Sequence, residues 1–326
     1  MSSLIKMPHE LPIDEAISCL IYGEPGVGKT TLALSAEAPV LIDMDRGMQR
    51  VDRRLQCPCV RADSYAQILE LFDGDEISCF KTIVIDPFDR MLDSIIAHLA
   101  AKNSKILAAD GSVNIRAWGT INAECKRFLN LVRSQKKGLI FIAHSQVEKI
   151  GDVERLRPKI PGSSRVELVR DLDLVGYMCI SKGRRTIFFN KNDDFWSKES
   201  ACLTEPVIIP ESADAYNKLK TFYSTDIYGA VVRYRAEMAR MKAEYDELLS
   251  AQDAILATIV DVDTLNIAYA SLKAIEKPIW DSITVWKRAL QAKAQELGAG
   301  YNKSKDVFEV CLGKSTSGRP TQNASK

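Results

Sequence analysis

The chain has 326 residues, of which 46% are hydrophobic and 27% are charged. This balance is typical of a folded globular protein and excludes a disordered or fibrous chain, and the length fits about two domains. Lysine and arginine total 44 against 43 aspartates and glutamates. A net charge of +1 excludes attraction of nucleic acid or anionic lipid by the whole molecule, so any polyanion site must be local.

The first 13 residues lack the basic and then apolar pattern of a signal peptide. The chain contains no run of about 18 apolar residues, the length that spans a bilayer. Eight cysteines are scattered without the spacing of a disulfide framework. We therefore expect free thiols, no contact with a membrane and a location in the cytoplasm.

From residue 14 to 221, short apolar runs alternate with amphipathic stretches, which predicts an α/β domain with a mostly parallel central sheet flanked by helices. Four runs are apolar on both faces, as strands between two helix layers must be. Each ends in glycine or polar residues, at the sheet edge where ligands bind in such folds. The four runs are 16–22, 40–42, 82–85 and 138–143.

The first run leads into a complete G-x-x-x-x-G-K-[ST] motif, and a helical stretch follows it. A strand, a glycine-rich loop and a helix in this order are the context that a P-loop requires. The glycines let consecutive backbone N–H groups turn toward phosphates, and the helix N-terminus adds partial positive charge. The motif predicts a nucleotide site made of Gly23, Glu24, Pro25, Gly26, Val27, Gly28, Lys29, Thr30 and Thr31.

Three side chains define the expected phosphate and metal chemistry. Lys29 would reach the β- and γ-phosphates, and the Thr30 hydroxyl would bind Mg²⁺. Asp86, which follows run 82–85, would supply a carboxylate to the same ion. We therefore predict that the chain binds ATP with Mg²⁺.

Asp86 is followed by Pro87 rather than by glutamate, so the base that orients the attacking water must come from elsewhere. Asp45 is the best-placed candidate for this base. If the second strand extended as far as Asp45, the side chains of Asp43 and Asp45 would lie on the same face of the strand. One could then act as the base and the other support it. An ordinary turn is the competing interpretation of Asp45. His144 is predicted to sense the γ-phosphate, with a simple strand end as its competing interpretation.

A P-loop alone does not distinguish an ATPase from a GTPase or a small-molecule kinase. Asn190 to Asp193 spells the N-K-x-D pattern that reads guanine, but the D-x-x-G switch of GTPases is missing after the metal-binding strand. We interpret this segment as a polar turn between strands. A small-molecule kinase would need an arginine-rich lid, and none is evident.

The region from 222 to 300 reads as helix only. Two apolar stripes begin at Ile227 and Leu265, and Asp263 is the predicted N-cap and Gly298 the predicted stop of the second. One interpretation is a helical hairpin that packs on itself or on the core. The other is a coiled-coil-like arm for assembly or partner binding.

The final stretch has almost nothing to bury and is expected to be a disordered tail. The sequence thus predicts four parts: an N-terminal segment 1–13, a P-loop domain 14–221, a helical C-terminal region 222–300 and a polar tail 301–326.

Taken together, the motif residues resemble the RecA-like P-loop ATPases, and among them the phage-encoded RecA/Rad-type ATPases associated with single-strand annealing recombination. The resemblance covers about residues 14–205 and is carried by 20–31, 41–47, 82–86, 141–144 and 171–177. In that group a catalytic glutamate follows the second core strand, and a polar sensor ends the strand after the metal-binding one. The resemblance therefore implies catalytic roles for Asp45 and His144 beside Lys29.

The resemblance also implies an ATPase, stimulated by DNA, that acts on single-stranded DNA in phage-type homologous recombination or annealing. It implies a homo-oligomer in the host cytoplasm, with a single-stranded-DNA-binding or annealing protein as partner. DNA-binding loops would fall at about 102–118 and 146–170. The second loop could contact a DNA backbone or be an ordinary solvated loop, because acidic residues dilute its charge. Its basic candidates are Lys149, Arg155, Arg157, Lys159 and Arg165.

Some relatives place a basic residue of a neighbouring subunit against the nucleotide. The sequence offers four candidates for that role and does not separate them: Arg184, Arg185, Lys191 and Lys198. The alternative function is a nucleotide-dependent loader or adaptor that recruits a replication or recombination partner through the helical region.

Overall fold

The computed structural model describes residues 16–151, 153–162, 164–199, 202–211, 216–273, 275 and 279–311. Their contacts form two compact units that meet in sequence after Arg235. The expected boundary at 221/222 lies earlier in the chain. The difference arises because the first turns of helix α7 (Gly229–Thr258) belong to the first unit, where Val231 is fully buried.

Among the residues described, the first unit is built on a nine-stranded mixed sheet with the order β3-β2-β4-β5-β1-β7-β8-β9, in which β6 pairs with β5. The six strands from β3 to β7 in this order are parallel, and β6, β8 and β9 pair antiparallel with their neighbours. The strands are β1 (Ser18–Gly23), β2 (Pro39–Asp43), β3 (Cys59–Val60), β4 (Thr82–Asp86), β5 (Gly138–Ile150), β6 (Val153–Pro158), β7 (Leu174–Ser181), β8 (Arg184–Phe188) and β9 (Val207–Ile208).

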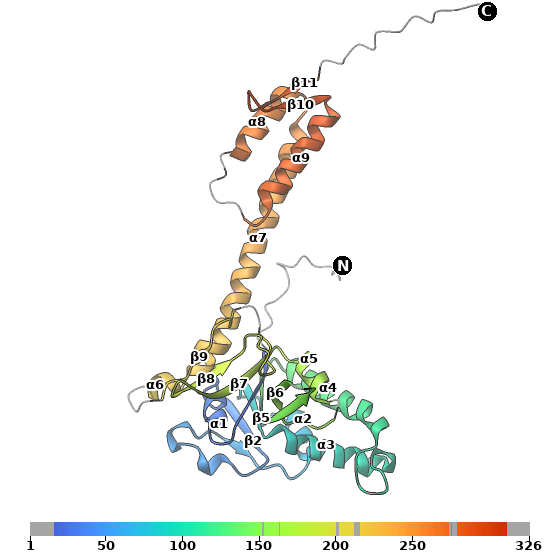
Figure 1. The fold of residues 1–326 in the computed structure, drawn as a ribbon, viewed down its shortest axis with the longest axis vertical. Coiled ribbons are helices and arrows are strands. Elements are labelled where there is room, and N and C mark those ends of the chain that lie inside the picture. The colour runs from blue at the N-terminus through green and yellow to red at the C-terminus, as the bar shows by residue number, and fades with distance from the viewer. Residues whose placement is uncertain are drawn as a thin grey trace, which may run out of the picture. The chain divides into compact units, whose positions relative to one another are not determined.

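Helices cover both faces of this sheet, as the apolar strands require (Figure 1). Helices α2, α3, α4 and α5 pack on one face, and α1 with the start of α7 packs on the other. The mostly parallel α/β class and the four central strands predicted from sequence are confirmed. The helices are α1 (Lys29–Ala33), α2 (Tyr65–Asp73), α3 (Phe88–Lys102), α4 (Trp118–Ser134), α5 (Ser164–Asp171) and α6 (Tyr216–Leu219), followed by a π-helical segment, η7 (Tyr223–Tyr228), and α7.

The segment expected to be a loop at 146–170 is largely regular. Strand β5 runs for 13 residues and pairs antiparallel with β6, so the two form a β-hairpin beyond the sheet edge. Helix α5 follows. Backbone pairing holds the extension in place, because residues 145–150 of β5 pair with residues 153–158.

The second unit has its own hydrophobic core. Helices α8 (Val262–Lys273) and α9 (Ser282–Glu296) pack together, and a β-hairpin of β10 (Ala299–Asn302) and β11 (Val307–Val310) covers them. The prediction of helix only, followed by disorder from 301, is therefore wrong for residues 299–310. Buried Phe308 explains the difference, because it gives this polar stretch an anchor in the core.

The two apolar stripes begin at residues that pack in a core. Ile227 lies in the core of the first unit, and Leu265 lies in the core of the second. Asp263 is not the N-cap of α8: the Asp261 carboxylate accepts from the Thr264 N–H at 2.8 Å. Gly298, at φ +65°, ends α9 as predicted. No helix among the described residues is both long and apolar enough to cross a membrane.

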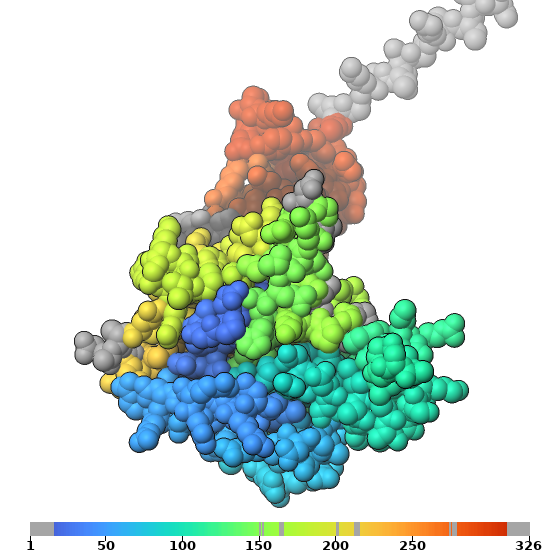
Figure 2. All heavy atoms as spheres, turned by 60° about the horizontal axis from the view of Figure 1, so that its bottom comes forward, coloured from blue at the N-terminus to red at the C-terminus, as the bar shows by residue number. Residues whose placement is uncertain are grey.

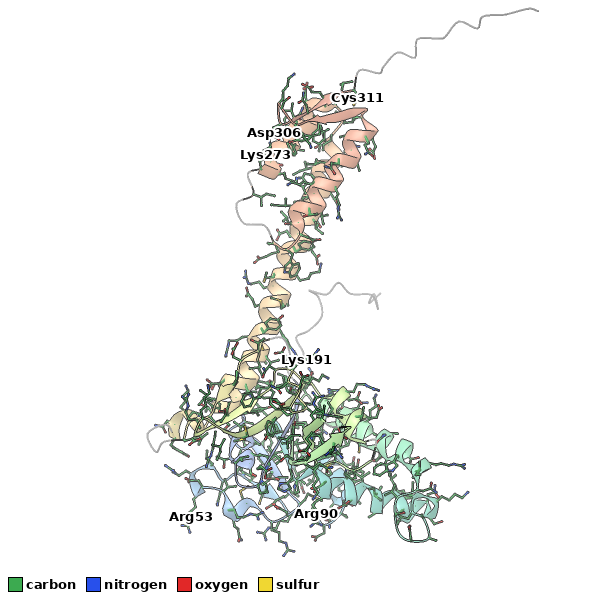
Figure 3. All side chains as sticks on the ribbon, viewed as in Figure 1. Arg53, Arg90, Lys191, Lys273, Asp306 and Cys311 are labelled. Carbon is green, nitrogen blue, oxygen red and sulfur yellow. The ribbon has the colours of Figure 1, made fainter. Side chains whose placement is uncertain are left out.

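Asn266 on α8 holds the hairpin in place. Its side chain donates to the Phe308 carbonyl at 2.9 Å and accepts from the Phe308 N–H at 2.8 Å. Nearby, Lys273 pairs with Asp306 at 2.5 Å, and both side chains are labelled in Figure 3.

We expect Asn266→Ala to destabilise the second unit by about 1–3 kcal/mol, because both polar groups of the Phe308 backbone lose their partners. Hydrogen exchange of the Phe308 amide should accelerate accordingly. The control is Ile267→Ala at the adjacent position, which is 71% exposed and should change stability by less than about 0.5 kcal/mol. Unchanged protection of Phe308 in Asn266→Ala would contradict the assigned role.

Candidate active site

The P-loop connects β1 to α1 and has the backbone that its glycines permit. Gly26 and Gly28 adopt φ values of +79° and +97°, in the left-handed region that favours glycine. Val27 packs into the core beneath the loop. In Figure 2 the dark-blue residues around the loop reach the surface beside the green residues of β5 and β6.

Lys29 lies inside the loop and is 6% exposed. Its Nζ donates to the carbonyls of Gly23 at 3.0 Å and Glu24 at 2.8 Å. Burial lowers the pKa of Lys29, and the nearby Asp86 and Glu24 carboxylates oppose that effect. The loop carbonyls thus hold the ammonium group where an anion entering the loop would meet it.

Thr30 and Asp86 are brought together from α1 and β4. The Thr30 hydroxyl donates to Asp86 Oδ2 at 2.6 Å. Burial raises the pKa of Asp86 to about 6, although the hydrogen bond from Thr30 opposes it. Burial destabilises the charged form of this carboxylate, so a nearby cation would stabilise it. A hydroxyl and a carboxylate oxygen are ligands that suit Mg²⁺.

A cavity of about 350 Å³ joins these groups to the next two strand ends. It brings together Lys29, Thr30, Asp45, Asp86 and His144, five residues that the sequence singled out from four separate segments. The cavity is lined by Pro25, Gly26, Gly28, Lys29, Thr30, Thr31, Asp45, Gly47, Arg50, Val51, Asp86, Ile142 and His144.

Strand β2 ends at Asp43, so the condition under which Asp43 and Asp45 would share a strand face is not met. Asp43 is 3% exposed, and its carboxylate accepts from the N–H groups of Gly47 at 2.8 Å and Met48 at 3.1 Å. Asp45 lies in the turn that Asp43 holds and lines the cavity. Its carboxylate pairs with Arg50 at 2.8 Å, a residue that the sequence did not single out.

His144 lies on β5 directly opposite Gly23 on β1. Its Nδ1 is buried and has no hydrogen-bond partner among the described residues. Burial and the Lys29 ammonium group lower the pKa of His144. The imidazole is therefore neutral near pH 7, with one nitrogen able to donate to an oxygen that enters the cavity.

The basic candidates on the β5–β6 hairpin and directly after it differ in their surroundings. Lys149 and Lys159 are exposed. Arg155 donates to the Asn192 and Phe195 carbonyls at 2.6 and 3.2 Å. Arg157 pairs with Glu148 at 3.1 Å, with 14% of its side chain exposed. The side chain of Arg165 lies outside the described residues.

The four candidates for a basic residue acting between subunits also differ in their contacts and exposure. Lys198 donates to the Leu172 and Arg170 carbonyls, the latter at 2.8 Å, and so has a structural role within its own chain. Arg185 lies beside Gly28 of its own P-loop, where a Cβ on Gly28 would be 3.3 Å from Nη1. Arg184 is exposed, and Figure 3 labels Lys191.

The segment from Asn190 to Asp193 follows β8 and precedes β9, as the polar-turn interpretation predicts. None of its residues lines the nucleotide cavity. The Asn190 carbonyl accepts from the Ser197 hydroxyl at 2.5 Å.

Comparison with protein families decides the class of this site. The family model described as "AAA domain" matches residues 15–201, more than half of the chain. The chain belongs to the AAA domain family. Within the matched range the AAA domain includes the P-loop, Asp45, Asp86, His144 and the β5–β6 hairpin. No curated protein is similar enough to the chain to count as a relative.

The AAA domain identifies the chain as a P-loop ATPase by family, with nucleotide binding as the expected property. The residues present fit the substrate and its metal: an ammonium group inside the loop, a hydroxyl and carboxylate pair, and an imidazole with an unpartnered nitrogen. Thr30 and Asp86 would hold Mg²⁺, which typically accompanies nucleotide in such domains.

Proposed function

We propose that this AAA-domain protein hydrolyses ATP and acts on single-stranded DNA in phage-type homologous recombination or annealing, as a homo-oligomer. The observation that carries the enzymatic part is the cavity in which Lys29, the Thr30–Asp86 pair, Asp45 and His144 converge. The DNA part is supported by the resemblance of these motifs to RecA-like ATPases and by two exposed lysines, Lys149 on the β5–β6 hairpin and Lys159 directly after it.

Each residue has a distinct task in the proposed reaction. Lys29 binds the β- and γ-phosphates, and Asp45 orients water for in-line attack. The water oxygen bonds to the γ-phosphorus while the bond to the bridging oxygen breaks, ADP leaves with that electron pair, and the water proton passes to Asp45. Mg²⁺ would supply neutralisation of charge on the phosphate oxygens.

His144 connects hydrolysis to the hairpin in this proposal. Its neutral imidazole donates to a γ-phosphate oxygen, and the same strand continues without interruption to Lys149. Lys149 and Lys159 are the residues proposed to contact the DNA backbone. Arg155 and Arg157 hold the hairpin through internal contacts, so their proposed part in DNA binding is to position it.

Hydrolysis measured with and without single-stranded DNA, together with a salt titration of DNA binding, tests this function. We expect DNA to stimulate hydrolysis. The double variant Lys149→Ala/Lys159→Ala should reduce the slope of log K against log salt by about 1.4, the loss of two backbone contacts.

The matched control is Lys218→Ala/Lys220→Ala, which removes two exposed lysines at helix α6 and should leave the slope unchanged. An equal slope in the hairpin variant and the wild type would remove the hairpin from the DNA site. DNA binding without any salt dependence would contradict backbone contacts altogether.

A second candidate is a nucleotide-dependent loader or adaptor. The separate core formed by α8, α9 and the β10–β11 hairpin supports it, because a folded unit outside the ATPase match can bind a partner, such as a single-stranded-DNA-binding or annealing protein. Hydrolysis that DNA does not stimulate but such a partner does would favour this candidate.

A further inference from the structure

The turn after β2 presents an arginine to the nucleotide cavity. The buried Asp43 carboxylate fixes the turn through the backbone N–H groups of Gly47 and Met48. A 3₁₀ helix, η2 (Met48–Arg50), follows, and the Arg50 N–H donates to the Gly47 carbonyl at 2.9 Å. The backbone of Arg50 is thus anchored beside the cavity that its side chain lines.

The side chains of Arg50 and Asp45 meet beside Gly47. Arg50 Nη2 lies 2.8 Å from Asp45 Oδ2. A Cβ placed on Gly47 would lie 2.8 Å from Asp45 Oδ1 and 2.9 Å from Arg50 Nη2. The absence of a side chain at position 47 therefore lets a carboxylate and a guanidinium group meet at the wall of the cavity.

This ion pair is easily exchanged. The Arg50 side chain is 70% exposed and that of Asp45 36% exposed, and such pairs contribute about 0–1 kcal/mol. A γ-phosphate carries more charge than a carboxylate and offers the fork of a guanidinium two acceptor oxygens. An arriving triphosphate thus competes well for Arg50.

We propose that Arg50 is a catalytic residue that contacts the γ-phosphate of ATP bound in its own chain and, by leaving Asp45, frees that carboxylate to orient water. This inference rests on the proposed ATP hydrolysis. The guanidinium group neutralises oxygens of the transferring phosphoryl group while the bond to the bridging oxygen breaks. Arg185 lies beside Gly28 but does not line the cavity.

The test compares Arg50→Ala with Arg53→Ala. Arg53 lies on the next 3₁₀ helix, η3 (Arg53–Leu55), is exposed and does not line the cavity; Figure 3 labels it. We expect Arg50→Ala to lower kcat by about 100-fold and Arg53→Ala to leave it unchanged. Arg50→Lys should recover part of the loss, because it restores the charge without the fork.

Binding gives a second readout. Arg50→Ala should lose about tenfold in affinity for a non-hydrolysable ATP analogue and keep its affinity for ADP, which lacks the γ-phosphate. If the wild type does not hydrolyse ATP, the proposed function fails. If the wild type hydrolyses ATP and Arg50→Ala matches it or exceeds it, only the role of Arg50 is overturned.

Mixed samples establish which chain the arginine serves. Because Arg50 acts in its own chain, mixing Arg50→Ala with Lys29→Ala should not restore hydrolysis. Recovery in the mixture would overturn action within one chain, since an intact Arg50 of one subunit would then complete an intact P-loop of another.

Discussion

Replacing Lys29 with alanine is expected to lower the kcat of ATP hydrolysis by about 10²- to 10³-fold and to weaken ATP binding. The ammonium group is buried within the loop, 3.0 and 2.8 Å from the carbonyls of Gly23 and Glu24. A phosphate entering the loop would take the place of these carbonyl contacts and gain a full opposite charge. Steady-state hydrolysis and the binding of a fluorescent ATP analogue measure the two effects.

Asp45→Asn separates binding from turnover in the same experiment. The amide fills the same space but cannot accept the water proton, so we expect ATP affinity to be kept and kcat to fall by about 10²-fold or more. Lys218→Ala on helix α6 is the control for general loss of activity. Hydrolysis at the wild-type rate by Lys29→Ala would show that this cavity is not the site of the reaction.

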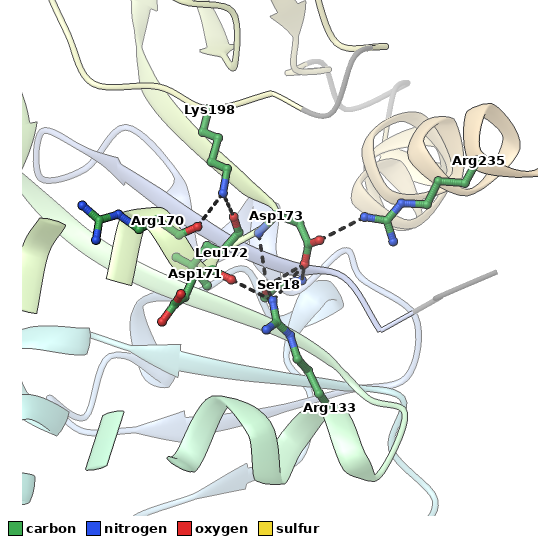
Figure 4. A network of polar contacts seen from close by, with 8 residues as sticks. All are labelled: Ser18, Arg133, Arg170, Asp171, Leu172, Asp173, Lys198 and Arg235. Atoms are coloured by element: carbon green, nitrogen blue, oxygen red, sulfur yellow. Dashed lines mark hydrogen bonds and ion pairs between the residues drawn. The ribbon is translucent and has the colours of Figure 1, made fainter. Parts of the chain in front are cut away.

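Asp173→Asn is expected to destabilise the first unit by about 3 kcal/mol. The Asp173 carboxylate accepts from the Ser18 N–H at 2.9 Å, the Ser18 hydroxyl at 2.7 Å and the Arg235 guanidinium at 3.0 Å, and Arg133 lies 3.5 Å away (Figure 4). The substitution leaves two half-buried arginines without this charge. Denaturant unfolding, followed by a probe in the first unit, measures the loss.

The contribution of Asp173 to the stability of the first unit depends on pH. Burial alone would raise the pKa of Asp173, but the hydrogen bonds from Ser18 and Arg235 outweigh it and hold the pKa below its ordinary value. The stabilisation is complete above the unfolded pKa of about 4 and is lost as the pH falls through the lower folded pKa. The difference between wild type and Asp173→Asn should therefore shrink below about pH 4.

Asp171→Asn is the matched control two residues away. Asp171 pairs with Lys126 at 3.3 Å, and 59% of that lysine side chain is exposed. Loss of this exposed ion pair should lower the free energy of unfolding by less than about 1 kcal/mol. The hydrogen bonds of Ser18 should be unaffected. Equal destabilisation by the two substitutions would contradict the claim that the contacts of the Asp173 carboxylate stabilise the first unit.

The sequence predicted the parts of the fold whose signals are local. The central strands are apolar on both faces, and the P-loop combines glycines that need positive φ with a lysine and a threonine at fixed spacing. The placement of Asp45, Asp86 and His144 around one cavity followed from one topological fact, that parallel strands end at the same edge.

Features that depend on distant partners were not predictable from one sequence. Arg50 follows Asp45 by five residues, but its approach depends on a turn fixed by buried Asp43. The contacts of Arg155 depend on carbonyls 37 and 40 residues away. Strand β11 exists because Phe308 reaches a core made by α8 and α9. For Arg155 and for Phe308 the local composition was that of a solvated loop and a polar tail.

The length of β5 has a mechanical consequence. Gly23 of the P-loop and His144 are paired neighbours across β1 and β5, and the strand continues through Lys149 before it turns into β6. Five residues of extended backbone span roughly 17 Å. Because β5 is one unbroken strand over this span, a displacement of His144 would reach the hairpin as motion of one continuous backbone.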